Sequence, residues 1–171
     1  INQLVDIEFS GRVSYSFYNE PLLNNNLGNY VEKTKKYLPK SFIELYTNGS
    51  LLTREVIGRL ITSGVDKFTI TRHEDVSDDE LEKTLALLPP EQRIKIVYKN
   101  FKEINLTNRG GTLPHLGNSE KTTFLPCKIP EKIMSITLEG NVLPCFEDFF
   151  QKNTMGNVNQ THLREIWNSE K

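Results

Sequence analysis

The sequence predicts an α/β protein made of parallel βα repeats, followed by a small β-hairpin and a helix. Two observations support the repeats: short β-branched or aromatic runs alternate with amphipathic helical patterns, and Gly or Pro closes each helical pattern. Alternation of this kind is typical of βαβ units with right-handed crossovers. A third observation supports the appendage, because the repeat stops after residue 111. We therefore expect a core at residues 1–111 and an extension at residues 112–171. The pattern does not decide whether the sheet of the core is flat or curls into a barrel.

Composition and charge narrow the class of protein. The 171 residues are 37% hydrophobic and 25% charged, which is typical of a globular chain, and Lys and Arg (21) nearly balance Asp and Glu (22). Such a balance favours neither nucleic acid nor an anionic membrane as a partner. No apolar run approaches the ~18 residues of a membrane span, and the N-terminus lacks a signal peptide pattern, so we expect a cytoplasmic protein. Because the chain begins at Ile1 within an amphipathic pattern, we also expect a piece of a longer polypeptide.

The first repeat begins with the strand pattern "GRVSYSFY" at 11–18. A helical pattern follows from about Asn29 and ends at Pro39, with a predicted buried side comprising Tyr30, Thr34, Tyr37 and Leu38. The second strand is "SFIELYT" at 41–47.

The second helix is predicted to begin after Thr53 as N-cap and to end at Gly64 in a left-handed cap. Its apolar stripe comprises Val56, Ile57, Leu60 and Ile61. The third strand is "VDKFTIT" at 65–71.

The third helix carries the clearest local signal of the chain. Ser77 and Glu80 have the spacing of a capping box, and the apolar stripe that follows comprises Leu81, Leu85 and Leu88. Pro89 and Pro90 end the pattern. The strands "RIKIVYK" at 93–99 and "EINLTNRGG" at 103–111 are expected to complete the core.

The extension is expected to form a hairpin and a helix. The segment "IMSITLEGNVLPC" at 133–145 places Gly140-Asn141 between two apolar runs, and a turn at this pair puts Cys145 opposite Ile136. The helix follows Thr161 as its predicted cap, with Leu163, Ile166 and Trp167 at helical spacing.

Polar segments follow the predicted strands at "YNEP", "TNGS", "TRHED", "YKN" and "NRGG". In parallel α/β folds, ligands bind beyond the carboxyl ends of the strands, so these segments are candidates for one concave site. Ordinary strand-to-helix turns are also polar, and this alternative stays open for each segment.

The only two cysteines, Cys127 and Cys145, both lie in the extension and both follow a proline. A hairpin brings its two ends together, so the thiols are expected to be neighbours. Two thiols are half of a zinc or iron–sulfur site. His115 and His162 offer further ligands without the spacing of a zinc motif, and a pair of structural thiols is the alternative.

Several of these segments resemble the radical S-adenosylmethionine enzymes. The run "YNEPLL" is similar to the Gly-Gly-Glu-Pro turn of that family, and "TNGSLLTREVIGRLITSGVDKFTIT" is similar to its third strand, helix and fourth strand. The block "PCKIPEKIMSITLEGNVLPCFEDFFQKNTMGNV", followed by "LREIWNSEK", resembles the opening of the auxiliary-cluster extension called SPASM or twitch.

The resemblance implies a partial, open TIM-like barrel and a radical enzyme. The whole protein would use electrons from an external donor and a [4Fe–4S] cluster to cleave S-adenosylmethionine, and the 5′-deoxyadenosyl radical would abstract hydrogen from a peptide or small-molecule substrate. The family's Cys-x3-Cys-x2-Cys motif does not occur in these residues, so we expect them to be inactive alone.

The resemblance also assigns residues to sites. The cofactor-binding candidates are Tyr18, Asn19, Glu20, Pro21, Thr47, Asn48, Thr69, Thr71, Arg72, Val97 and Tyr98, and the metal candidates are Cys127 and Cys145. Glu20 would accept the methionine amine, although Asn19 replaces the usual glycine and adds a Cβ at the ligand. The alternative for Glu20 is an N-terminal helix cap beside Pro21. Asp148 would hydrogen-bond near the auxiliary site or cap a turn.

Two other functions remain open. One is a cluster-free binding module that holds a nucleotide or a peptide, and an upstream three-cysteine motif would exclude it. The other is an unrelated α/β domain of the flavodoxin type. The first crossover has no Gly-rich phosphate loop, which counts against this alternative.

Overall fold

The computed structural model describes residues 1–71, 79–99, 113 and 127–169. The chain divides into two compact units, Ile1–Ile104 and Asn105–Lys171. The boundary after residue 111 that the sequence predicts stays a prediction.

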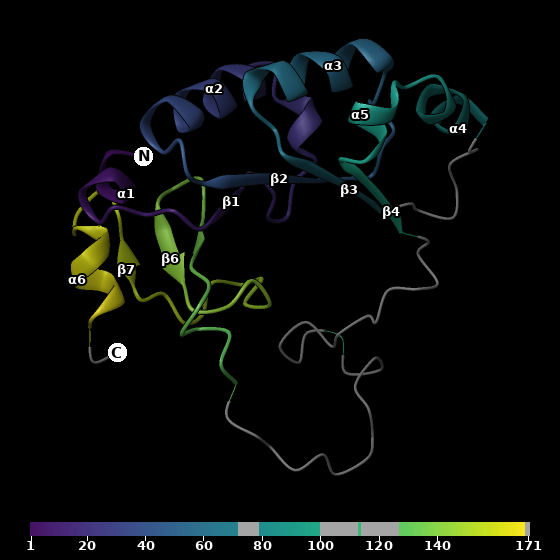
Figure 1. Cartoon of the computed structure of the whole chain (residues 1–171). Helices are drawn as coiled ribbons and strands as arrows, with labels where there is room; N and C mark the ends of the chain where they lie inside the picture. The colour runs from purple at the N-terminus through teal and green to yellow at the C-terminus, as the bar shows by residue number, and fades with distance from the viewer. Residues whose placement is uncertain (72–78, 100–112, 114–126, 170–171) are drawn as a thin grey trace. The chain divides into compact units, whose positions relative to one another are not determined.

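Among the described residues of the first unit, four strands form a sheet in the order β1-β2-β3-β4, and they are parallel, as predicted. The strands are β1 (Arg12–Ser14), β2 (Phe42–Thr47), β3 (Lys67–Thr71) and β4 (Ile96–Lys99). The helices are α1 (Asn2–Asp6), the 3-10 helix η1 (Pro21–Leu23), α2 (Leu27–Tyr37), α3 (Arg54–Ser63), α4 (Asp79–Ala86) and α5 (Pro90–Arg93). Helices α2 to α5 all lie on one side of the sheet, so the other face of the sheet carries none of them (Figure 1).

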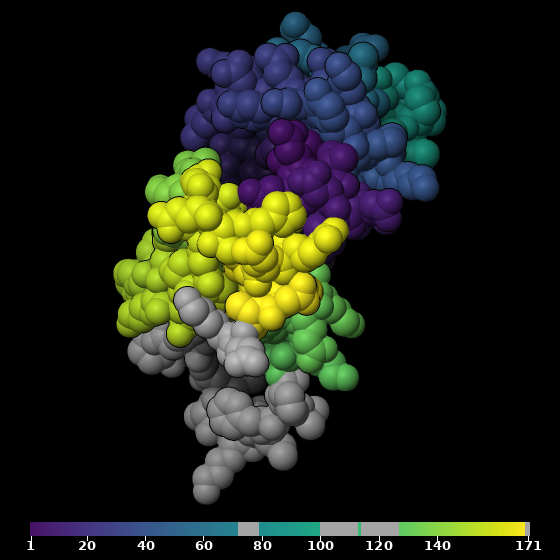
Figure 2. Space-filling model, turned by 90° about the vertical axis from the view of Figure 1, so that its left-hand side faces the viewer, coloured from purple at the N-terminus to yellow at the C-terminus, as the bar shows by residue number. Residues whose placement is uncertain are grey.

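The core of the first unit fills the space between the sheet and these helices. On β2 and β3 the side chains alternate between the two faces, and the buried apolar members Ile43, Leu45, Phe68 and Ile70 face the helices. By contrast, α1 has no buried residue and lies at the surface of its unit (Figure 2).

The buried side of α2 agrees with the prediction only in part, because Thr34 and Leu38 are buried but the two tyrosines are not. Helix α2 begins at Leu27, two residues earlier than expected, and buries Leu27, Val31 and Thr34. Tyr30 and Tyr37 are 44% and 45% exposed, so their predicted burial was wrong. The reason is that Leu27, Val31 and Thr34 follow the helical period on one face, which places both tyrosines beside that face.

The boundaries of α3 agree with the prediction. The Thr53 hydroxyl accepts a hydrogen bond from Val56 N at 3.2 Å, and Gly64 ends the helix with φ +118°. Ile57 and Leu60 are buried.

The segment after α3 agrees with the prediction only in part. Leu88 is buried, and Leu81 and Leu85 pack against the core. The Pro-Pro pair ends α4 but also opens the short helix α5, which the sequence analysis missed, so β4 begins at Ile96. The predicted Ser77 cap and the predicted strand at 103–111 lie outside the described residues.

The described residues of the second unit form a three-stranded antiparallel sheet and a helix. Strands β5 (Ser135–Ile136), β6 (Asn141–Leu143) and β7 (Gly156–Asn157) pair in that order, and α6 (Leu163–Trp167) follows. The hairpin was predicted, but β7 was not, because a two-residue strand leaves no alternation to detect.

The hairpin register corrects one prediction. Ile136 pairs with Val142, not with Cys145. The loop takes one residue more than expected, and Gly140 adopts φ +87° at its end, a conformation that a side chain disfavours.

The N-cap of α6 is a second correction. His162 Nδ1, not the Thr161 hydroxyl, accepts a hydrogen bond from Arg164 N, at 3.2 Å. Leu163 and Ile166 are buried, as the helical spacing predicts. Among the described residues, no helix is long and apolar enough to cross a membrane.

Candidate cofactor site

The Glu20 carboxylate lies at the carboxyl edge of the parallel sheet, where the segment after β1 meets the end of β2. Its Oε1 accepts hydrogen bonds from Leu22 N at 3.1 Å and from the Thr47 hydroxyl at 2.8 Å. Its Oε2 accepts a hydrogen bond from Asn48 N at 2.9 Å. The carboxylate therefore caps η1, as the structural alternative predicted, and also joins η1 to β2 through two long-range hydrogen bonds.

None of the three donors to Glu20 carries a charge. Within the described part of the chain, no Lys, Arg or His nitrogen lies within ion-pair distance of Glu20. A carboxylate prefers a cationic partner in a partly buried place. Glu20 is therefore available to form an ion pair with a bound cation.

The neighbours of Glu20 in the "YNEP" turn are held within the turn. The Asn19 side chain accepts a hydrogen bond from Phe17 N at 2.7 Å and donates one to Tyr15 O at 3.3 Å. Asn19 is not among the residues with positive φ, so its Cβ adds no backbone strain where the family usually has glycine. The Tyr18 ring packs edge-on against Phe17, with centroids 4.4 Å apart, and Pro21 is buried at the start of η1.

The strand candidates fall on both faces of the sheet. Thr69, Thr71 and Val97 share the face that the helices leave open, because Thr69 pairs with Val97 and Thr71 lies two residues beyond Thr69. Tyr98 pairs with Ile70 and so belongs to the opposite face. Arg72 lies outside the described residues.

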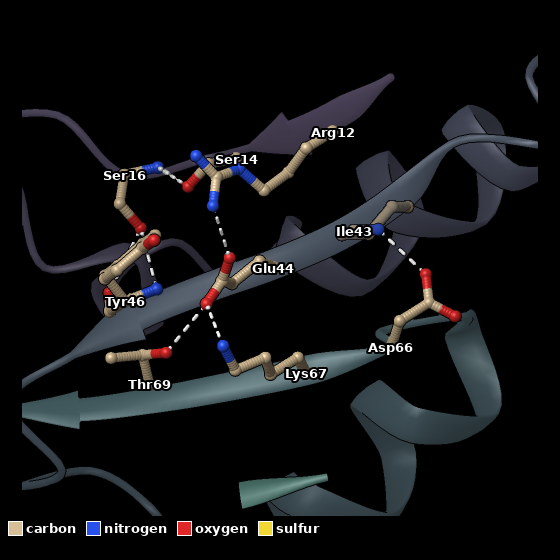
Figure 3. A network of polar contacts seen from close by, with 9 residues as sticks. All are labelled: Arg12, Ser14, Ser16, Ile43, Glu44, Tyr46, Asp66, Lys67 and Thr69. Atoms are coloured by element: carbon tan, nitrogen blue, oxygen red, sulfur yellow. Dashed lines mark hydrogen bonds and ion pairs between the residues drawn. The ribbon is translucent and has the colours of Figure 1, made fainter. Parts of the chain in front are cut away.

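A polar network that the sequence analysis missed occupies the open face (Figure 3). Glu44, only 2% exposed, accepts a hydrogen bond from Thr69 at 2.8 Å and forms ion pairs with Arg12 and Lys67, both at 3.0 Å. One carboxylate thus links three neighbouring strands. Burial by itself raises the pKa of Glu44, but the hydrogen bonds from Lys67 and Thr69, the Lys67 charge and the hydrogen bond from Arg12 together lower it below its ordinary value.

The network continues toward the carboxyl edge through Ser16 and Tyr46. The Ser16 hydroxyl donates to Tyr46 O and accepts from Tyr46 N, both at 3.1 Å, which extends the contact between β1 and β2 beyond Ser14. Burial and the charge of Glu44 raise the pKa of the Tyr46 phenol. A charged residue inside the apolar run "SFIELYT" was the available signal for this network.

The metal candidates lie in the second unit. Both cysteines are free thiols, Cys127 exposed and Cys145 half-buried. The Cys145 sulfur accepts a hydrogen bond from Glu147 N at 3.4 Å, and backbone donors of this kind stabilise thiolate ligands of iron–sulfur clusters. The expected proximity of the two cysteines stays a prediction.

Two other candidates of the second unit have structural roles. Asp148 accepts hydrogen bonds from Lys152 N at 3.0 Å and from Asn153 N at 2.8 Å, so it closes a turn. His162 caps α6, and His115 lies outside the described residues. No group of three or more His, Cys, Asp or Glu suited to a metal ion occurs in the part of the chain that the structure describes.

Comparisons with known proteins found relatives that cover residues of both units. Residues 127–171 match the family model of the SPASM iron-sulfur cluster-binding domain. The whole chain is 37% identical to the S-adenosyl-L-methionine-dependent 2-deoxy-scyllo-inosamine dehydrogenase of Niallia circulans and covers 68% of its length.

Two solved structures share the fold. The crystal structure of BtrN in complex with AdoMet and 2-DOIA matches 99% of this chain with TM-score 0.89 and 36% identity, and that of SeMet BtrN in an open conformation matches 99% with TM-score 0.72 and 32% identity. The chain spans 66% and 64% of these two structures, slightly less than two thirds. The chain therefore belongs to the radical S-adenosylmethionine enzymes that carry a SPASM or twitch extension, as shown by its parallel sheet, its match to the cluster-binding family and its 37% identity along all 171 residues to the relative.

Proposed function

We propose that this chain belongs to an S-adenosylmethionine-dependent dehydrogenase that acts on a small polar molecule. The relative from Niallia circulans is named for 2-deoxy-scyllo-inosamine, which makes that compound the first substrate to test. This reading favours a small molecule over the peptide that the sequence left open. An external electron donor remains part of the proposal.

The observation that carries the proposal is the environment of Glu20. Its carboxylate lies at the carboxyl edge of the sheet and receives three hydrogen bonds from uncharged donors. It has no cationic partner among the described residues. The methionine moiety of S-adenosylmethionine carries an ammonium group, which is the kind of partner that this carboxylate lacks. The residues therefore fit the cofactor.

The second unit fits an auxiliary cluster in the same sense. Cys145 already receives a backbone N–H on its sulfur, and Cys127 lies at the start of the segment that matches the cluster-binding family. When bound, the clusters would supply electron transfer. We propose that residues 1–111 hold S-adenosylmethionine and that residues 112–171 contribute Cys127 and Cys145 to the auxiliary cluster.

Substitution of Glu20 in the complete enzyme tests the cofactor site. We expect Glu20→Ala to weaken S-adenosylmethionine binding by about 1.5–3 kcal/mol, the range for hydrogen bonds to charged groups. Calorimetry measures the affinity, and Glu55→Ala, in the exposed first turn of α3, is the control. Unchanged affinity in a folded Glu20→Ala enzyme would reduce Glu20 to a cap of η1.

The reaction itself is tested with the complete enzyme, S-adenosylmethionine and a reductant. We expect 5′-deoxyadenosine and oxidised 2-deoxy-scyllo-inosamine to form together. If 5′-deoxyadenosine forms but the compound is not oxidised, the family assignment stands and the substrate proposal fails.

A further inference from the structure

We propose that Thr47 is a positioning residue: it does not contact the cofactor but fixes the orientation of the Glu20 carboxylate, so that Oε2 faces the ligand. This inference rests on the proposed function of Glu20. It changes the role of Thr47, which the family resemblance assigned to the cofactor-binding residues themselves.

The Thr47 hydroxyl is already engaged within the protein. It donates its proton to Glu20 Oε1 at 2.8 Å and accepts a hydrogen bond from Gly49 N at 3.1 Å. A hydroxyl has a single proton to donate. Thr47 is also only 5% exposed, so its side chain has neither a donor nor the surface to bind a ligand directly.

The two oxygens of Glu20 differ as a result. A carboxylate has about four acceptor positions. Oε1 receives two donors, from Leu22 and Thr47, whereas Oε2 receives only Asn48 N among the described residues. The acceptor position left for a ligand ammonium is therefore on Oε2. Thr47 fixes this arrangement, because its hydroxyl occupies a position on Oε1.

The turn after β2 holds Thr47 in this orientation. Thr47 is β-branched, which restricts χ1, and Gly49 adopts φ +82° in a closely packed place. A Cβ at Gly49 would lie 2.9 Å from Leu81 Cδ2 and 3.0 Å from Ile70 Cγ2. Asn48 Oδ1 accepts from Ser50 N at 2.9 Å and from the Ser50 hydroxyl at 2.7 Å, so hydrogen bonds within the protein hold the turn.

Two variants of this chain separate the hydroxyl from the volume of Thr47. Thr47→Val keeps the shape and removes the hydroxyl, whereas Thr47→Ser keeps the hydroxyl. We expect faster amide hydrogen exchange at Leu22 and Asn48 in Thr47→Val, because the carboxylate that both amides bind is no longer held, and near-normal exchange in Thr47→Ser. The Val56 amide, bonded to Thr53, is the internal control.

Affinity measurements on the complete enzyme test the role toward the cofactor. We expect Thr47→Val to weaken S-adenosylmethionine binding by roughly 3- to 10-fold, a typical loss for one hydrogen bond, and Thr47→Ser to restore it. In a Glu20→Gln background, Thr47→Val should weaken binding little further, because the effects of two substitutions that act through one group do not add.

The outcomes distinguish this inference from the proposed function. Equal losses of affinity with and without Glu20 would overturn the inference, because Thr47 would then act independently of Glu20. Unchanged exchange and affinity in a folded Thr47→Val protein would also overturn it. If exchange at Leu22 and Asn48 rises while Glu20→Gln itself leaves affinity unchanged, Thr47 holds the carboxylate as described but the proposed function of Glu20 fails.

Discussion

At the scale of single residues, two carboxylates of the first unit have opposite environments. Glu44 is paired with Arg12 and Lys67, so its charge is compensated within the protein. Glu20 is bonded only by neutral donors in the described part of the chain. The first arrangement suits a structural link between strands, and the second suits a site for a cationic ligand.

The lowered pKa of Glu44 predicts a loss of stability in acid. Because the folded-state pKa lies below the unfolded value of about 4.3, ionised Glu44 stabilises the fold above that pH, and this contribution is lost as pH falls through the folded-state pKa. Glu44→Gln should lower the free energy of unfolding near neutral pH by about 1.5–3 kcal/mol. It should also remove the Glu44 part of the acid dependence.

Urea unfolding of wild type and Glu44→Gln between roughly pH 3 and pH 7 measures how the free energy of unfolding depends on pH. Paired carboxylates become protonated in this range. Thr69→Val, which removes one donor and leaves the carboxylate and both cations, is the matched control and should retain a weaker acid dependence. Parallel pH curves for wild type and Glu44→Gln would contradict the prediction.

At the scale of elements, the ends of helices are determined locally, whereas their buried sides and neighbours are not. Thr53 and Gly64 bound α3 through contacts within a few residues. The buried side of α2 depends on segments farther away, and it differs in part from the prediction. The register of the β5–β6 hairpin differs because its loop takes one residue more than expected.

The N-cap of α3 predicts a measurable loss. Thr53→Ala should lower the free energy of unfolding by about 1 kcal/mol, because Val56 N loses its acceptor at the helix start. Thr62→Ala is the control, since the Thr62 hydroxyl bonds Gly58 O inside the same helix and caps no free N–H group. Equal unfolding midpoints in denaturant for wild type and Thr53→Ala would show that the cap contributes nothing.

At the scale of the whole molecule, the chain combines a parallel α/β unit with a small antiparallel unit that bears both cysteines. In the first unit, Glu20 has no cationic partner among the described residues, and in the second unit Cys145 receives a backbone N–H. The two candidate sites thus belong to different units, and separate substitutions can test them.

The cysteines give the prediction that belongs to this scale. In the complete enzyme, replacing Cys127 and Cys145 by Ala should remove about one cluster's iron, because cluster ligation depends on thiolates. S-adenosylmethionine binding should persist, since Glu20 lies in the other unit. Iron quantitation and calorimetry on the same preparation measure both effects. Unchanged iron content would leave the cysteines as structural thiols.

The sequence by itself determined the features that depend on one segment at a time. The alternation of strand and helix patterns determined the parallel sheet, Thr53 and Gly64 determined the ends of α3, and the "YNEP" and cysteine segments indicated the family. These are local signals, because a helical period, a cap or a turn is read from residues close together in the chain.

The tertiary structure alone decided the features that depend on which residues lie opposite one another. It brought Glu44 between Arg12 and Lys67 and placed the Thr47 hydroxyl beside the Glu20 carboxylate. Glu20 and Thr47 are 27 residues apart in the chain, and Arg12 and Glu44 are 32 apart. No local pattern encodes such contacts, since they follow from strand register, and a shift of one residue would turn each side chain to the other face.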